Sequence, residues 1–379
     1  MKQESIFDVA VIGAGTMGMA AGAFLAKQQV KTLLIDAYDP PHNHGSHHGG
    51  TRMIRHAYGE GRQYVSLVQR AQQLWTELEE DSGYKIFEKT GVLGLGPEDS
   101  VFLHETIEAA KKYNLPLKVL SANEITEKWP EIQLPEHYIG CLETESGLVY
   151  SEKAIQAYKE IALKNGAKLV TNSPVLQIEM NDENEIKIIT ANEEFLAKKI
   201  IVTVGAWASK LLPNLKLPIQ PVRKVVSWFE APKDKFDIGH FPSFYVDDVN
   251  KMFYGFPNID GAGIKLGRTD GGQPIDPDKH SQNYGAYESD EGELRDFLQT
   301  YLPEANGKLV EGRTCLMTQS SDHHFIIDFH PENDQVILAC GFSGHGFKFA
   351  SVMGEVLSQL AVDGKTEHDI SLFALNRSF

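Results

Sequence analysis

The sequence is poor in cysteine and has no long apolar run. Its 379 residues hold three cysteines, Cys141, Cys315 and Cys340, which lie far apart. An odd and scattered set does not suit a disulfide framework, so we expect a reducing compartment, the cytoplasm. No stretch approaches the roughly 18 consecutive apolar residues of a membrane span, and residues 1–5 lead into the chain without an apolar signal region. We therefore predict no membrane partner.

Positive charge is also scarce. Lysine and arginine together number 36 against 52 aspartates and glutamates, which gives a net charge of −16. Because contact with phosphate backbones needs a basic surface, we predict no nucleic-acid partner. A local cluster of cations can still bind an anionic small molecule. The hydrophobic content of 42% is ample for burial, and the length suits two domains rather than one.

A glycine-rich segment, GAGTMG at 13–18, stands between an apolar run at 9–12 and a helical pattern at 19–28. We interpret the run as a buried parallel strand and the glycines as the turn before a helix, as in dinucleotide-binding sites. Gly13 permits the tight turn, Gly15 lets the backbone approach a pyrophosphate, and Gly18 lets the helix pack closely on the sheet. The helix N-terminus offers free N–H groups to the anion.

A second apolar strand, 31–35, ends in Asp36. This carboxylate stands near the offset of about 20 residues at which an acid meets a ribose hydroxyl. We therefore predict a site for a dinucleotide with a free 2′-hydroxyl, the alternative being an ordinary strand-to-helix turn. The motif alone does not distinguish NAD from FAD.

Hydrophobic periodicity indicates further elements. We expect helices at 64–80, 100–113, 123–129, 152–165 and 353–361. We expect strands at 87–95, 168–170, 187–190, 199–204, 324–328 and 335–340, a hairpin of 139–143 and 147–149, and an antiparallel sheet between 218 and 302. The predicted fold class is α/β plus α+β. A Rossmann-like domain of residues 1–86, 150–217 and 320–379 is interleaved with an antiparallel-sheet substrate domain of residues 87–149 and 218–319.

The segment 39–61 lacks a regular pattern and is interpreted as a long functional loop. It holds five histidines without helical i, i+4 spacing and without a cysteine or acid placed beside them, so we predict no metal site. The histidines are His42, His44, His47, His48 and His56. Arg52 and Arg55 lie three residues apart and would share a face on one helical turn. They are either solvated or grip an anionic group of a substrate or cofactor.

Three more residues invite a functional interpretation. Lys348 follows the glycine-rich segment 341–346 and opens a helix, where the dipole disfavours a cation, so a carboxylate held across a site would explain it. Lys265, within an apolar strand segment, either extends to solvent or is buried near a cofactor. Cys315 is either a small buried hydrophobe or a thiol influenced by the adjacent cation Arg313.

Three segments carry a resemblance to a known family. They are GAGTMG at 13–18, GSHHGGTRMIRHAYGEG at 45–61 and GFSGHGFKF at 341–349. They resemble the monomeric sarcosine oxidase and N-methyltryptophan oxidase family, and the likeness covers nearly the whole chain. The resemblance implies a D-amino-acid-oxidase-like fold whose Rossmann-like domain binds FAD, attached covalently to Cys315 through its 8α-methyl group. The implied cofactor-binding residues are Gly13, Gly15, Gly18, Asp36, Thr51, Cys315, Gly344, Gly346 and Lys348.

The resemblance also implies a reaction. An N-methyl amino acid would pass a hydride equivalent to the flavin, the imine would be hydrolysed to formaldehyde and the amino acid, and molecular oxygen would be reduced to hydrogen peroxide. Arg55 and Lys348 would hold the substrate carboxylate, while Lys265 would assist oxygen reduction. The implied catalytic residues are Lys265, Arg52, His48 and Tyr254, and the implied substrate-binding residues are Arg55, Lys348, Tyr245, Thr269, Met317 and Gly344.

Three positions depart from the pattern of sarcosine-specific members. Tyr245, Thr269 and Met317 stand where we expect methionine, histidine and tyrosine, and all three border the substrate in that family. We expect a monomeric oxidase of N-methyl amino acids, with sarcosine favoured. N-methyl-L-tryptophan oxidase, and an oxidase or dehydrogenase of primary or cyclic amino acids, are the alternatives. A non-catalytic flavoprotein would have no use for an oxygen-activating Lys265.

Overall fold

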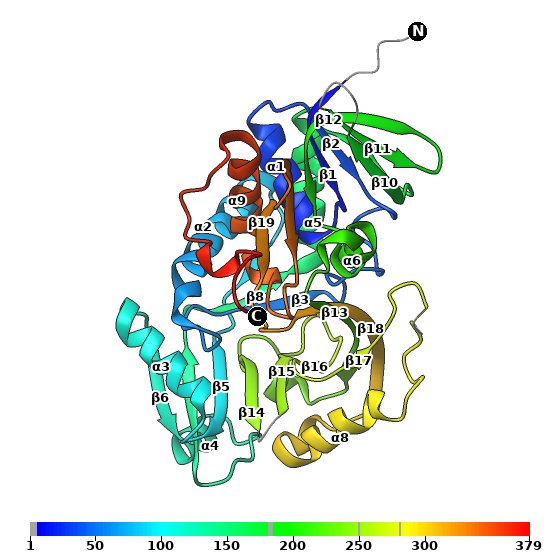
Figure 1. Ribbon diagram of the computed structural model, residues 1–379. Coiled ribbons are helices and arrows are strands. Elements are labelled where there is room, and N and C mark those ends of the chain that lie inside the picture. Colours follow the sequence, from blue (N-terminus) through cyan, green and yellow to red (C-terminus); the bar gives the residue numbers. More distant parts are fainter. Residues whose placement is uncertain (1–5, 181–184, 249–250, 280–281) are drawn as a thin grey trace.

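The computed structural model describes residues 6–180, 185–248, 251–279 and 282–379 (Figure 1). Residues 1–5, on which the prediction of a chain without a signal region partly rests, lie outside the described residues. Two large sheets and one small sheet organise the chain. The large sheets occupy the upper and lower halves of the view in Figure 1, and the small sheet lies between them.

The first large sheet has parallel strands in its middle. β1 (Phe7–Ile12) lies between β2 (Thr32–Ile35) and β12 (Glu194–Val202), and it is parallel to both. Residues 9–12 are buried, as expected for a central parallel strand. The remaining strands are β9 (Lys168–Val170), β10 (Val175–Met180), β11 (Ile186–Thr190), β19 (Ile326–His330) and β20 (Asn333–Cys340). The predicted strands in this part of the chain are confirmed, although several ends differ.

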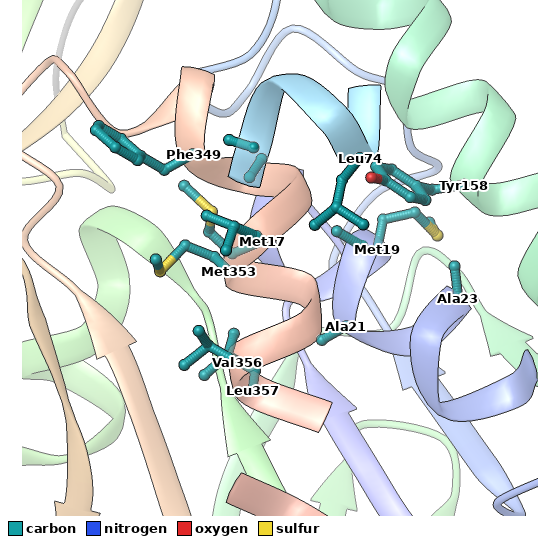
Figure 2. Packing of buried hydrophobic residues seen from close by; sticks show 14 of the residues in the cluster. Met17, Met19, Ala21, Ala23, Leu74, Tyr158, Phe349, Met353, Val356 and Leu357 are labelled. Carbon is teal, nitrogen blue, oxygen red and sulfur yellow. The ribbon is translucent and has the colours of Figure 1, made fainter. Parts of the chain in front are cut away.

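Four helices pack together beside this sheet. They are α1 (Thr16–Lys27), α2 (Val65–Ser82), α5 (Ser151–Lys164) and α9 (Ala350–Asp363). Figure 2 shows Met17 of α1 near Met353 of α9, and Met19 of α1 near Leu74 of α2 and Tyr158 of α5, all in one buried cluster. A Cβ atom on Gly354 would lie 2.8 Å from the Cβ of Ala20, so the close contact of α1 with α9 requires glycine there.

The turn from β1 into α1 depends on two glycines. Gly13 has a φ of +90°, and a Cβ there would lie 2.7 Å from the carbonyl oxygen of Thr203. A Cβ on Gly18 would lie 2.0 Å from the carbonyl oxygen of Gly13. The helix begins at Thr16, so the predicted start at residue 19 was wrong. Gly15 already caps the helix, and its carbonyl accepts from the N–H of Met19 at 2.9 Å.

The second large sheet is mostly antiparallel, as predicted for 218–302. Its strands run in the order β17-β13-β16-β15-β14-β5-β7-β6, and β18 pairs with β13. Their bounds are β5 (Val92–Pro97), β6 (Leu117–Ser121), β7 (Tyr138–Glu143), β13 (Ile219–Phe229), β14 (Ser243–Asp248), β15 (Lys251–Phe256), β16 (Ile264–Arg268), β17 (Gln273–Pro274) and β18 (Leu309–Ser320). β14 and β5 pair in parallel and join the two distant chain segments into one sheet.

Three helices accompany the second sheet. They are α3 (Val101–Tyr113), α4 (Ala122–Lys128) and α8 (Ser289–Tyr301). Phe297 of α8 packs on Phe253 of β15 with ring centroids 4.7 Å apart, and it stacks at 6.2 Å on Phe244 of β14. This aromatic cluster is the core under the sheet.

A small sheet corrects three predictions. It consists of β3 (Thr51–Ile54), β4 (Phe87–Glu88) and β8 (Gly147–Tyr150), and β8 pairs with the other two. The segment 39–61 therefore contains a strand, although its short run of mixed polarity gives no alternating pattern. The predicted hairpin of 139–149 was wrong because β7 pairs with β5 and β6 instead. The predicted strand 87–95 is broken at Gly91, which has a φ of +70°.

Short helices complete the chain. They are α6 (Ala208–Leu211) and α7 (Lys233–Phe236), with 3-10 turns η1 (Arg62–Tyr64), η2 (Gly205–Trp207), η3 (Pro213–Leu215), η4 (Pro303–Ala305), η5 (Phe347–Phe349) and η6 (Ser371–Phe373). Among the described residues, no helix combines the length and apolar character that crossing a bilayer requires. The domain boundaries given above stay a prediction.

Candidate functional site

A cavity of about 560 Å³ opens at the carboxyl ends of β1 and β2. Seven of the predicted site residues line it: Gly13, Gly15, Asp36, Arg52, Met317, Gly344 and Gly346. Segments from the start, middle and end of the chain therefore meet around one cavity. The carboxyl edge of a parallel sheet is the usual place for such a binding site.

The cavity wall around α1 suits a pyrophosphate. A Cβ atom on Gly15 would meet no atom within 4 Å, so there is open space beside the backbone at the start of α1. Gly15 offers no side-chain cap, which leaves the first N–H groups of the helix to a ligand. Asp36 is buried and accepts the N–H of Tyr38 at 2.9 Å.

Strand register brings several predicted residues onto one face of the second sheet. Directly opposed residues of an antiparallel pair point to the same face, and alternate residues along a strand share it. The opposed pairs are Tyr245 with Tyr254, Tyr254 with Gly267, Lys265 with Trp228, Cys315 with Lys224, and Met317 with Val222. Tyr245, Tyr254, Lys265, Cys315 and Met317 therefore project from a single face.

Lys265 ties this face to β3. Its buried Nζ donates to the carbonyl oxygens of Gly49 at 2.7 Å and Thr51 at 2.8 Å, and to the Thr51 hydroxyl at 3.0 Å. The amine also lies 4.8 Å from the ring centroid of Phe256 and 5.4 Å from that of Trp228. Burial, and then the charge of Arg52 (on β3), lowers the pKa of Lys265 well below its usual value.

Arg52 and His48 lie beside that amine. Arg52 donates to the carbonyl oxygens of Ser46 at 2.6 Å and His48 at 2.8 Å, which fixes its guanidinium over the preceding loop. Neither ring nitrogen of the buried His48 has a hydrogen-bond partner among the described residues. Burial, with the charge of Arg52, lowers the pKa of His48 to about 4. A neutral imidazole with free nitrogens fits a bound group that carries hydrogen-bonding atoms.

Arg55 lies in an aromatic cage. Its guanidinium carbon is 4.6, 5.0 and 5.2 Å from the ring centroids of Tyr58, Phe102 and Tyr245. The guanidinium also pairs with Glu60 at 2.5 Å. Burial raises the pKa of Glu60, but Arg55 outweighs this effect and holds that pKa at about 2. Arg52 lies on β3 and Arg55 just after it. The two arginines were expected to share a face only if they lay on one helical turn, so that expectation does not apply.

Lys348 approaches Arg55 from the other end of the chain. Its buried Nζ donates to the hydroxyl of Tyr58 at 3.2 Å and to the carbonyl of His345 at 2.9 Å. Tyr58 in turn donates to Nδ1 of His345 at 2.8 Å, because Nε2 of that ring donates to the carbonyl of His323. Burial, and then Arg55, lowers the pKa of Lys348 to about 7. Lys348 lies in η5 just before α9 rather than inside the helix.

The three departing positions differ in their surroundings. Met317 is buried, and its Sδ occupies the space beside Gly344, where an added Cβ would lie 2.3 Å from the sulfur. The Tyr245 ring crosses Gly94 of the neighbouring strand and belongs to a small apolar cluster under α3. Thr269 follows β16, is half-buried, and donates its N–H to the carbonyl of Met252 at 2.7 Å. Met317 alone of the three lines the cavity.

Cys315 is half-buried, whereas Cys141 and Cys340 are buried. Burial raises the pKa of the Cys315 thiol, and the charges of Arg52 and Lys224 oppose this rise. The thiol therefore lies on the same sheet face as Lys265, within a group of cations.

The loop histidines do not converge as metal ligands. Nδ1 of His42 accepts the N–H of His44 at 3.2 Å, and Nε2 of His47 accepts the N–H of His42 at 3.0 Å, so backbone groups occupy these nitrogens. A separate group of Glu355, Glu367 and His368 lies close together, but Arg70 binds both oxygens of Glu355. The absence of a metal stays a prediction.

Sequence analysis alone did not identify three residues around the site, namely Tyr58, Glu60 and Lys224. Glu60 and Tyr58 stand in the same segment as Arg55, and their cationic neighbour Lys348 is remote in sequence. Lys224 alternates with Val226 and Trp228 along β13, so the period of two placed it on one face with them. The alternating spacing could therefore have indicated the face on which Lys224 lies. Only the pairing of β13 with β18 shows that Lys224 is opposite Cys315.

Comparison with known proteins gives the family. A family model described as FAD dependent oxidoreductase matches residues 8–360. The monomeric sarcosine oxidase of Bacillus sp. (strain B-0618) is 54% identical over 98% of this chain and 96% of its own length. The N-methyl-L-tryptophan oxidase of Yersinia pestis (strain Pestoides F) is 41% identical over 98% of this chain and 99% of its own length.

Solved structures support the fold. The crystal structure of L-proline dehydrogenase from P. horikoshii matches with a TM-score of 0.86 at 22% identity, covering 99% of this chain and 98% of that chain. At this identity the match shows the fold alone, and it confirms the predicted α/β plus α+β class. By sequence and by fold, the chain belongs to the monomeric sarcosine oxidase and N-methyl-L-tryptophan oxidase family of FAD-dependent oxidoreductases.

Proposed function

We propose that this protein is an FAD-dependent oxidase that demethylates N-methyl amino acids, with sarcosine favoured, to the amino acid, formaldehyde and hydrogen peroxide. The observation that carries this proposal is the meeting of two buried cations, Arg55 and Lys348, which both contact Tyr58. Arg55 is paired with Glu60, whereas Lys348 donates to neutral oxygens. A buried cation pair of this kind is suited to the carboxylate of an amino acid.

The cofactor would lie in the cavity beside α1. Gly13, Gly15 and Asp36 would hold the dinucleotide, and Cys315 would carry the flavin covalently. FAD, when bound, supplies the two-electron acceptor for the hydride of the N-methyl carbon. The open space over Gly15 supports this assignment, as do the two ring nitrogens of His48, which have no hydrogen-bond partner in the described part of the chain.

The chain's own groups would orient the substrate. With its carboxylate between Arg55 and Lys348, a small amino acid is anchored at one end, and its amine extends toward the face that carries Tyr254 and Lys265. Anchoring of this kind lowers the entropic part of the barrier. Lys265 is held by three acceptors and would favour the transfer of electrons to oxygen as a fixed cation.

A bulkier N-methyl amino acid is the second candidate. Met317 lines the cavity against Gly344, and methionine adapts its shape more easily than an aromatic ring. The relative named as N-methyl-L-tryptophan oxidase supports this alternative, although its identity is lower than that of the sarcosine oxidase. We further infer a monomer, from the names of the relatives, and a cytoplasmic location, from the scattered free cysteines.

Peroxide release by the purified protein tests the proposal. Sarcosine, N-methyl-L-tryptophan, L-proline and glycine are compared in parallel, and bleaching of the flavin is followed without oxygen. Peroxide with sarcosine above the others is the expected result. A higher rate with N-methyl-L-tryptophan selects the second candidate, whereas flavin reduction without peroxide indicates a dehydrogenase and contradicts the proposed oxidase.

A further inference from the structure

Lys224 is a buried lysine that the proposed reaction does not use. It lies on β13 directly opposite Cys315 of β18. Opposed residues of an antiparallel pair project from the same face with Cβ atoms about 4.5–5.5 Å apart, so the two side chains are neighbours. The Nζ of Lys224 donates to the carbonyl oxygen of Asp270, which holds the stem beside β17 rather than in solvent. A buried lysine placed beside a half-buried thiol requires an explanation.

We propose that Lys224 is a positioning residue that favours the thiolate form of Cys315 during covalent attachment to FAD. This inference rests on the proposed function, which assigns the attachment to Cys315. The thiolate is the nucleophile in cysteine chemistry, and a cation beside the sulfur favours it. Lys224 is the cation in direct register with the thiol, while Arg52 and Lys265 reach the same face from β3 and β16.

The attachment step balances with molecular oxygen, the acceptor of the proposed function. The sulfur of Cys315 forms a bond to the 8α-methyl carbon, and a C–H bond of that methyl group breaks with loss of its proton. The electron pair remains on the isoalloxazine ring. Oxygen then removes two electrons and two protons as hydrogen peroxide, which leaves oxidised, attached flavin. Lys224 takes part in no electron transfer, because it only stabilises the charge on sulfur.

The charges around this pair set its response to pH. Burial lowers the pKa of Lys224 to about 8, and burial raises the pKa of Cys315. Each group favours the charged form of the other, but burial outweighs this effect in both, so the two titrations are coupled. The other charged groups that act on the thiol are Arg52, Lys265 and Arg223, and those that act on the amine are Asp270, Arg268 and Glu293.

The first test needs no flavin. Full-length protein from riboflavin-depleted cells is alkylated with iodoacetamide across a pH series, and the Cys315 peptide is quantified by mass spectrometry. Removal of a neighbouring cation shifts a pKa by about one to three units, so Lys224→Met should raise the midpoint by at least about one pH unit. Lys224→Arg should restore it. Lys199→Met is the matched control, because this lysine lies on β12 of the first sheet and donates to the carbonyl of Ala361 on α9. An unchanged midpoint in Lys224→Met overturns the proposal.

The second test follows attachment itself. FAD is added to the same proteins, and covalent flavin is measured after denaturation by in-gel fluorescence. Lys224→Met should attach FAD about tenfold more slowly near neutral pH and recover at high pH, where the thiol ionises without help. Slow attachment at every pH would mean a structural defect and would overturn the role. Covalent flavin in Cys315→Ala would instead refute the attachment site in the proposed function, whatever the Lys224 variants do.

Discussion

The Nζ of Lys265 donates to the carbonyl oxygen of Thr51 at 2.8 Å and to its hydroxyl at 3.0 Å. These bonds join β16 of the second sheet to β3 of the small sheet, the strand that carries Arg52. The amine is therefore buried and fixed between the two sheets rather than a mobile surface group. This geometry suits a role in which the Lys265 ammonium assists the reduction of oxygen and does not move during the other steps of the reaction.

Replacement of Lys265 by methionine should separate the two half-reactions. We expect reduction of the flavin by sarcosine to stay within a few-fold of the original rate, and reoxidation by oxygen to slow by about 10²–10³, the usual effect of removing one preorganised electrostatic group. Stopped-flow absorbance measures both steps. Lys199→Met, which alters a lysine on the first sheet, should change neither step. Equal losses in both half-reactions would contradict the role given to Lys265.

Carboxylate affinity should depend on the protonation of Lys348. Burial and Arg55 lower the pKa of Lys348 to about 7, so the ammonium is present below that pH and is lost above it. The dissociation constant for methoxyacetate, which is sarcosine with its amine replaced by an ether oxygen, should rise by up to about tenfold per pH unit above pH 7. Calorimetric titration at several pH values measures it. Lys348→Arg keeps its charge and should flatten the profile, and an unchanged slope in that variant would point to another group.

Glu60 should compete with the substrate for Arg55. The two side chains pair at 2.5 Å, and the pKa of Glu60 stays at about 2, so the competing carboxylate is charged at every working pH. Glu60→Gln should bind methoxyacetate about tenfold more tightly, equivalent to about 1.4 kcal/mol. It should also lower the free energy of unfolding by about 3 kcal/mol, because Arg55 is left buried without its partner.

A matched control separates these two effects. Glu108→Gln removes an exposed carboxylate that pairs with Lys111 at 2.9 Å, and it should change neither the affinity nor the stability appreciably. Saturating methoxyacetate should restore much of the stability lost in Glu60→Gln. Weaker binding in Glu60→Gln would show that the glutamate supports Arg55 instead of competing for it.

The sequence predicts the local parts of this site better than the distant ones. The turn at Gly13 and the contact of Gly18 with the strand follow from neighbours in the chain, so the glycine pattern indicates them directly. The long strands have a clear hydrophobic pattern. The sequence therefore predicted that they exist, although several of their ends were predicted incorrectly. By contrast, β3 is short and mixed in polarity, and it is a strand because β8 supplies its partner.

Pairs that join remote segments were beyond single-sequence reasoning. Arg55 and Lys348 were each identified from the sequence as candidate carboxylate-binding residues. Their shared contact with Tyr58 follows only from the folded structure, which brings the two distant segments together. The hairpin of 139–149 was wrong for the same reason, because β7 and β8 are adjacent in sequence and belong to different sheets. Lys224 gained its interest only from the register of β13 with β18. Nonlocal strand pairing decides such relationships, and hydrophobic period alone does not specify it.

The choice between sarcosine and a bulkier substrate should depend on Met317. Its Sδ fills the space beside Gly344 at the cavity wall, so shortening this side chain enlarges the wall without removing Arg55 or Lys348. Met317→Ala should raise the ratio of kcat/KM for N-methyl-L-tryptophan to that for sarcosine by about tenfold or more, within the range that one pocket contact usually controls. Met353→Ala truncates a buried methionine in α9, away from the cavity lining, and should lower stability by about 2–5 kcal/mol without changing the ratio. If the ratio falls or stays constant in Met317→Ala, the methionine does not border the substrate, and the determinant of specificity must be sought at Tyr245 or Thr269.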